Sequence, residues 1–154
     1  TPSVAEARQV FAVRRMLEAE MVRAFMAQST PAKIRSLRQH VAAEKKAMER
    51  EDVGQRTELL GDFHVRMAEL MGNEVLAQLL GELISRCALI TLMYQSNVAA
   101  EHSHDEHADI VEALAGGDAD HAVQLMRQHL DNVEAGLTFD RDVPTSDLSM
   151  ALSA

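Results

Sequence analysis

Residues 104–130 read HDEHADIVEALAGGDADHAVQLMRQHL, and this stretch decides the fold. Apolar residues follow His107 at positions three, four and seven along, which is the spacing of one helical face. Two consecutive glycines at 116–117 then end the helix, and Asp118 is a typical N-cap for the next. Apolar residues also surround His129 at helical spacing. The stretch therefore predicts two amphipathic helices, each with one histidine directed inward.

The rest of the chain has the same helical character. Ala, Leu, Met, Glu and Arg dominate, aromatic residues make up 3%, and no alternating strand pattern occurs. Caps and breaks predict six helices, at about 4–28, 31–51, 54–71, 74–100, 104–116 and 119–137. We expect an all-α antiparallel bundle of six to seven helices, with one domain over 1–137 and a loose tail over 138–154.

Composition excludes several classes of protein. Among 154 residues, 15 are Lys or Arg and 24 are Asp or Glu, so the formal net charge is −9 and direct nucleic-acid binding is not expected. The single cysteine, Cys87, excludes a disulfide framework, and its apolar neighbours predict inert core. No uninterrupted apolar run reaches the roughly 18 residues of a membrane span. Residues 1–20 are charged throughout, unlike a signal peptide, so we expect a cytoplasmic protein.

Three histidines are the informative residues. His64, His107 and His129 each lie within an apolar stripe, on three different predicted helices. Imidazole is the commonest metal ligand in proteins, and three inward rings can hold Zn, Ni or Mn with positions left open for a ligand. The alternative is that each ring is a hydrogen-bonded core or pocket residue, since spacing does not show whether the rings meet.

The other histidines have weaker signals. His40 and His121 stand beside polar neighbours and are expected at the surface. His102 and His104 flank the predicted start of the fifth helix, which Ser103 is expected to cap, and we interpret both as solvated. His104 and His107 are three residues apart, so shared ligation is the alternative for that pair.

Several segments together carry a family resemblance. Phe63-His64 followed by Gly72-Asn73 resembles a motif of the form FH…GN. Residues 106–114 resemble EHxxIlxAl, residues 118–130 resemble DxxxAxxxMxxHL, and residues 13–18 resemble vRxxlE. In order and spacing, the chain resembles the FCD domain, the C-terminal effector-binding domain of FadR-type GntR transcription regulators.

The resemblance covers most of the chain and implies a helical bundle with a metal site. Many members of the family hold a divalent metal through one Asp and three His, and a small organic acid completes the coordination. By motif position, the histidines correspond to His64, His107 and His129. The family aspartate lies four residues before the first histidine, where this chain has Leu60. The resemblance thus implies three protein ligands, with water or the carboxylate of the effector in the remaining position.

The resemblance also places two arginines at the effector. Arg14 corresponds to the arginine of the first helix, and Arg86 lies in the long fourth helix. A guanidinium suits a carboxylate, so both are predicted to bind the effector. The alternative for Arg14 is an ion pair with Glu18 one turn away, and Arg15 competes with it for the register.

The expected function is that of an effector-sensing, homodimeric domain of a transcription regulator rather than an enzyme. DNA would be bound only through a winged helix-turn-helix upstream, which is not in this chain. The main alternative is a small metal-dependent helical-bundle enzyme in which the three histidines hold a catalytic ion. The pattern places no general base beside them. A further alternative is a structural bundle that binds no ligand.

Overall fold

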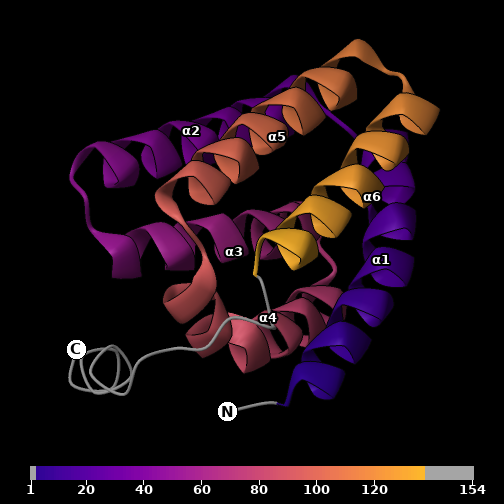
Figure 1. Cartoon of the computed structure of the whole chain (residues 1–154). Helices are drawn as coiled ribbons and strands as arrows, with labels where there is room; N and C mark the ends of the chain where they lie inside the picture. The colour runs from indigo at the N-terminus through magenta and orange to yellow at the C-terminus, as the bar shows by residue number, and fades with distance from the viewer. Residues whose placement is uncertain (1–2, 138–154) are drawn as a thin grey trace.

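The structure, a computed structural model, describes residues 3–137, which form six helices and no strand (Figure 1). The helices are α1 (Val4–Ala27), α2 (Pro31–Glu49), α3 (Val53–Leu70), α4 (Glu74–Tyr94), α5 (Asn97–Gly116) and α6 (Ala119–Gly136). The predicted all-α bundle is confirmed. The predicted loose tail over 138–154 lies outside the described residues.

Helix ends follow from capping side chains at most of the predicted positions. Each cap accepts a hydrogen bond from the backbone N–H three residues later, and these caps are Ser3, Thr30, Asn73 and Asp118. Gly72 and Gly117 follow helix ends with φ of 74° and 76°, a left-handed conformation that glycine adopts without strain. These predicted boundaries are confirmed.

The predicted boundary between the fourth and fifth helices is wrong. α4 ends at Tyr94, Gln95 leaves the helix with ψ 119°, and Ser96 caps α5 by accepting from the N–H of Ala99. Ser103, the expected cap, lies inside α5 and is buried. The Ser-x-x-Glu pattern at 103–106 matches a capping box but does not begin a helix. Ser96 caps α5 without an acidic residue three positions later.

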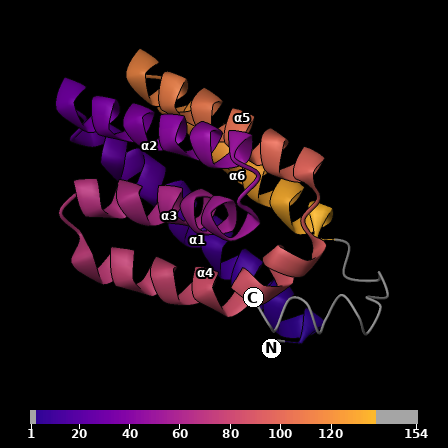
Figure 2. The same cartoon turned by 90° about the vertical axis from the view of Figure 1, so that its left-hand side faces the viewer.

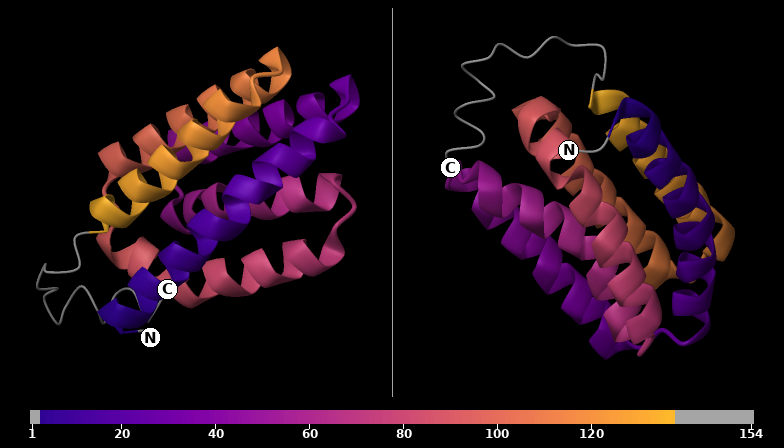
Figure 3. Two further views of the ribbon diagram at one scale, coloured as in Figure 1. Left: turned by 90° about the vertical axis from the view of Figure 1, so that its right-hand side faces the viewer. Right: turned by 90° about the horizontal axis from the view of Figure 1, so that it is seen from below.

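The six helices close into a ring. Going round it, α1 packs against α6, α6 against α5, α5 against α2, α2 against α3, α3 against α4, and α4 against α1. Figures 2 and 3 show α2 beside α5, and α1 beside α6, although these partners are far apart in the sequence. α3 also contacts α1 and α5, so it lies toward the middle of the ring. Side chains from four other helices therefore meet around α3.

Apolar side chains fill the ring in two clusters. The larger cluster draws on all six helices and includes the fully buried Phe25, Leu37 and Phe63. The smaller cluster joins the start of α1 to the second half of α4, with Phe11 and Cys87 among its members. Cys87 is 4% exposed, and burial raises the pKa of its thiol, in keeping with the prediction of an inert cysteine.

Contact between α3 and α4 depends on a glycine. A Cβ at Gly61 would lie 2.8 Å from Cγ2 of Ile84, a stiff β-branched side chain on α4. At Gly81, by contrast, a Cβ would meet Cγ2 of Val65 at 4.0 Å, an ordinary contact. Gly61 therefore permits the close approach of the two helices.

We predict opposite effects of alanine at the two glycines. Gly81→Ala should be neutral or stabilising by up to about 1 kcal/mol, because alanine favours helix. Gly61→Ala should be less stable than Gly81→Ala by about 1–3 kcal/mol, because overpacking forces α4 outward. Urea unfolding of both variants measures the difference, and equal stability would contradict the tight contact.

Candidate metal centre and ligand cavity

The three inward histidines meet in the middle of the ring of helices. His64 comes from α3, His107 from α5 and His129 from α6, and all three are at most 2% exposed. One ring nitrogen from each lies within 4.8 Å of the other two. Phe63 stacks on the His107 ring with centroids 4.0 Å apart and fixes its plane. The structure thus brings together the three residues that the sequence singled out.

A carboxylate stands behind each histidine ring. In each case a carboxylate oxygen pairs with Nδ1, and the pairs are Glu18 with His64, Glu44 with His107 at 2.7 Å, and Glu106 with His129 at 2.7 Å. An ionised carboxylate only accepts, so each Nδ1–H donates and fixes the tautomer of its ring. In a neutral imidazole, Nε2 then carries a lone pair. This arrangement of carboxylate behind histidine is typical of metal-ligating rings.

Two of these lone pairs face each other. Nε2 of His107 lies 3.0 Å from Nε2 of His129. With both Nδ1 atoms protonated, a neutral pair presents two acceptors and no donor, which is repulsive unless a cation or proton lies between them. Two nitrogens at about 2.1 Å from one ion and at right angles about it are separated by about 3.0 Å. The donor set therefore fits a metal ion.

Glu18 and Arg14 set the charge beside His64. Arg14 Nε donates to Oε2 of Glu18 at 2.8 Å, and Glu18 is fully buried. Burial alone would raise the pKa of Glu18, but Arg14 and His64 outweigh it and lower the pKa to about 2. Burial lowers the pKa of His64 to about 3, despite the attraction of Glu18. At neutral pH, Glu18 is therefore ionised and His64 is neutral, the form that ligates metals.

Glu44 pairs with two histidines of α5 at once. Its Oε1 pairs with Nδ1 of His104 at 3.1 Å, while Oε2 pairs with His107. Burial raises the pKa of Glu44, and burial lowers the pKa of His107 well below its usual range. The hydrogen bond from His104 to Glu44 raises the pKa of His104. His104 therefore helps to satisfy a carboxylate that burial would otherwise neutralise.

Two predictions about the other histidines are wrong. His104 was expected to be solvated, but its side chain is 14% exposed and lies well inside α5, because that helix begins seven residues earlier than predicted. His40 was expected at the surface, but its Nε2 donates to the carbonyl of Leu59 at 2.7 Å and its side chain is 13% exposed. His102 and His121 are exposed, as predicted.

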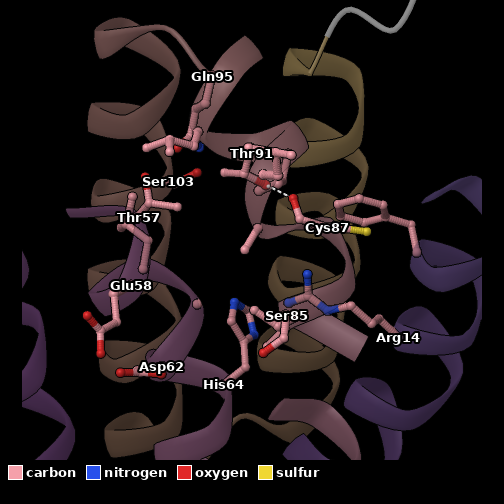
Figure 4. A pocket seen from close by; sticks show the side chains of 18 of the residues that line it. Arg14, Thr57, Glu58, Asp62, His64, Ser85, Cys87, Thr91, Gln95 and Ser103 are labelled. Atoms are coloured by element: carbon pink, nitrogen blue, oxygen red, sulfur yellow. Dashed lines mark hydrogen bonds between the residues drawn. The ribbon is translucent and has the colours of Figure 1, made fainter. Parts of the chain in front are cut away.

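A cavity of about 450 Å³ opens beside the histidines (Figure 4). All three histidines and Arg14 line it, and Figure 4 shows the Arg14 guanidinium pointing inward on the same side as His64. Leu60 also lines the cavity one turn before His64, where a carboxylate would reach the same space. The site therefore offers three imidazole nitrogens and the guanidinium of Arg14 beside a mainly apolar wall, and the carboxylates of Glu58 and Asp62 also line the cavity.

The remaining predicted residues lie elsewhere. Arg86 has a 60% exposed side chain, reaches Glu6 at 3.3 Å and does not line the cavity. Arg15 pairs with Glu134 at 2.7 Å at the surface and does not line the cavity either. The predicted alternative for Arg14, an ion pair with Glu18, is present together with its place at the cavity.

Sequence reasoning missed the carboxylates behind the rings. Glu44 stands three residues after Val41 and four before Met48, on the apolar face of α2, where a charged residue needs a partner. Glu18 occupies the equivalent position in α1, seven residues after Phe11. A carboxylate on an apolar stripe was the signal available.

Fold and site together define an all-α domain built around a buried histidine site. Comparison with protein families matches residues 9–132 to the FCD domain. No curated protein matches the chain significantly. Because the match covers well over half of the residues, the chain belongs to the FCD domain family. It is an effector-binding domain of the kind found in GntR-family transcription regulators, which bind DNA through another domain.

The buried histidines predict the pH dependence of stability in the metal-free protein. An unfolded chain takes up a proton on His64 at its ordinary pKa of 6.5, whereas the folded chain takes it up only near 3. Stability should therefore be full above pH 6.5 and fall as the pH drops from 6.5 toward 3, by up to about 1.4 kcal/mol per pH unit for this group. Below pH 4.5, Glu18 adds to the loss, because its folded pKa is about 2.

Urea unfolding in EDTA across this pH range measures the effect. His64→Gln, which keeps a donor for Glu18 but does not titrate, should make the dependence shallower, and the remainder belongs to His107, whose pKa burial also lowers. His121→Gln, at the surface, should leave it unchanged. A dependence in His64→Gln as steep as that of the wild type would contradict the contribution of this ring.

Proposed function

We propose that this domain senses a small carboxylic acid at a divalent cation held by His64, His107 and His129. The observation that carries the proposal is the convergence of three buried rings, each with a carboxylate on Nδ1, at a cavity that Arg14 also lines. DNA would be bound through an upstream winged helix-turn-helix, and we place the regulator in the cytoplasm. Effector binding would bias the arrangement of two protomers.

Each residue has a stated role in this proposal. The three histidines hold the cation, and Glu18, Glu44 and Glu106 orient their rings. When bound, the cation supplies a Lewis acid for a carboxylate oxygen. Arg14 uses Nε for Glu18, and its terminal nitrogens are directed to the second oxygen of the effector carboxylate. An all-nitrogen ligand set favours Zn or Ni over Mn.

Leu60 has a particular consequence for binding. Because leucine stands where the family has aspartate, no anionic side chain joins the three rings around the cation. The effector carboxylate then supplies the anionic ligand. Arg86 stays a predicted effector contact, without support from its place at the surface.

An enzymatic role has less support. The family is one of transcription regulators. The three carboxylates that pair with the rings are engaged on Nδ1, and the two others that line the cavity, Glu58 and Asp62, are not part of the three-histidine cluster.

We predict that Zn²⁺ or Ni²⁺ binds the wild-type chain and that His129→Ala weakens binding at least tenfold, as expected for loss of one of three ligands. His121→Ala, eight residues earlier on the same helix and exposed, is the control and should bind as the wild type does. Leu60→Asp should bind more tightly than the wild type, because it restores an anionic ligand one turn before His64. Titration calorimetry measures all four proteins.

Affinity should hold as the pH drops through 6.5 and fall only at lower pH, because burial lowers the pKa of His64 to about 3 and that of His107 well below its usual range, and imidazole must be neutral to ligate. If the wild type binds neither metal at sub-millimolar concentration, or if His129→Ala binds equally well, the site does not hold a metal. The histidines would then be hydrogen-bonding residues of the cavity.

The outer face of α4 supports dimerisation. α4 is long and apolar enough to cross a membrane by length and composition, with mean hydropathy 1.6 over its most apolar window, yet only 22% of that window is buried. Val75 is 79% exposed and Leu79, one turn later, is 40% exposed. We infer that a second copy of this chain covers the face, as homodimeric regulators require.

We predict that Leu79→Glu converts a dimer to a monomer, because it puts a charge in an apolar contact. Gln124→Glu adds the same charge at an exposed position on α6, away from this face, and should stay dimeric. Sedimentation velocity at tens of micromolar distinguishes the two. A wild type that sediments only as a monomer would contradict the proposed dimer.

A further inference from the structure

The cavity has a second polar end, away from the histidines. Figure 4 shows His64, Ser85 and Arg14 at one end and Gln95 at the other, near Ser103. Between the two ends, α4 contributes a mainly apolar wall, with Ile84, Ala88, Leu89 and Leu92 among its residues. From Ile84 to Gln95 the lining runs along about 16 Å of helix. The cavity is therefore elongated, with polar groups at both ends.

Gln95 carries an unpaired acceptor at that far end. Its Oε1 is buried and has no hydrogen-bond partner, and among residues 3–137 only one other buried side-chain N or O atom shares this state, Nε of Arg56. Arg56 donates through Nη1 to Oδ1 of Asn97 at 2.7 Å, so it lies at the same junction of α4 and α5. Both unsatisfied atoms thus lie at one end of the molecule, although buried polar groups are nearly always paired.

Two hydroxyls near Gln95 are already used as donors. Thr91 Oγ1 donates to the carbonyl of Cys87 at 3.0 Å, and Thr57 Oγ1 donates to the carbonyl of Val53 at 2.8 Å. Each is bound within its own helix. Neither of these hydroxyls pairs with Gln95, and its unpaired oxygen can accept from a donor that enters the cavity.

We propose that Gln95 determines which acids the cavity accepts, and that the effector is a carboxylic acid with an apolar body and a terminal hydroxyl. The carboxylate binds at the end with the histidines and Arg14, the body lies along α4, and the hydroxyl donates to Oε1 of Gln95. This inference rests on the proposed function of the cavity, and it adds the class of effector. A site built to pair with a hydroxyl rejects the analogue that lacks it, because its own acceptor is then left unpaired.

Matched acids test the proposal on the Zn-loaded chain. The probes are hexanoate, octanoate and decanoate, each with its ω-hydroxy counterpart, and the readout is the dissociation constant from titration calorimetry. In the wild type, at least one ω-hydroxy acid should bind about tenfold or more tightly than the unsubstituted acid of equal length. Gln95→Met should abolish that preference by weakening the hydroxy acid. Gln95→Glu, which retains an acceptor, should keep it.

Gln78→Met is the control, because Gln78 is an exposed glutamine on the same helix and does not line the cavity. It should keep the preference of the wild type. If the acids bind but every pair binds equally to the wild type, or if the preference survives in Gln95→Met, the role of Gln95 is overturned and the proposed function stands. If none of the acids binds the Zn-loaded chain, both fail.

Discussion

Three histidine–carboxylate pairs in the centre of the ring are the constraint on which the rest of the structure depends. Two of the pairs bury both groups, and in the third His129 is buried while Glu106 is 24% exposed, so each buried group requires its partner to be in place. Glu18 on α1 holds His64 on α3, Glu44 on α2 holds His107 on α5, and Glu106 on α5 holds His129 on α6. The pairs join five of the six helices. The polar centre thus fixes the relative positions of helices whose apolar faces alone would allow some sliding.

α4, the helix that takes part in none of these pairs, has a different role. Where it lines the cavity it is mainly apolar, and no charged side chain of α4 is among the residues that line it. The charged side chains that line the cavity are Arg14 on α1 and Glu58 and Asp62 on α3, with the imidazoles of α5 and α6 beside them. Recognition of an anion is therefore separated from recognition of shape, which α4 and the α4–α5 junction provide.

Much of the fold could be predicted from sequence, because caps and apolar spacing are local. The ends of most helices followed from Ser3, Thr30, Asn73 and Asp118. The break at Gln95 could not be predicted, because Ser96 lacks the usual acidic residue after a cap and Ser103 has one. That error also misplaced His104.

The candidate site was predictable in its members but not in its assembly. Helical spacing directed His64, His107 and His129 inward, but whether three helices bring their rings together depends on packing between distant segments. Glu44 carried a readable signal, a charge on an apolar stripe, whose partner only the fold reveals. Arg86 illustrates the converse, since its motif position favoured the effector while the packing of α4 leaves it at the surface.

Gly61 is a position at which the shape of the cavity could be engineered apart from its charged groups. It lies in the cavity wall on α3, and the absence of its side chain leaves room for Ile84 on α4. A larger residue there would press α4 outward, while the charged side chains that line the cavity stay on α1 and α3. The spacing between α3 and α4 therefore bears on the width of the cavity, a property separate from the charges that would bind an anion.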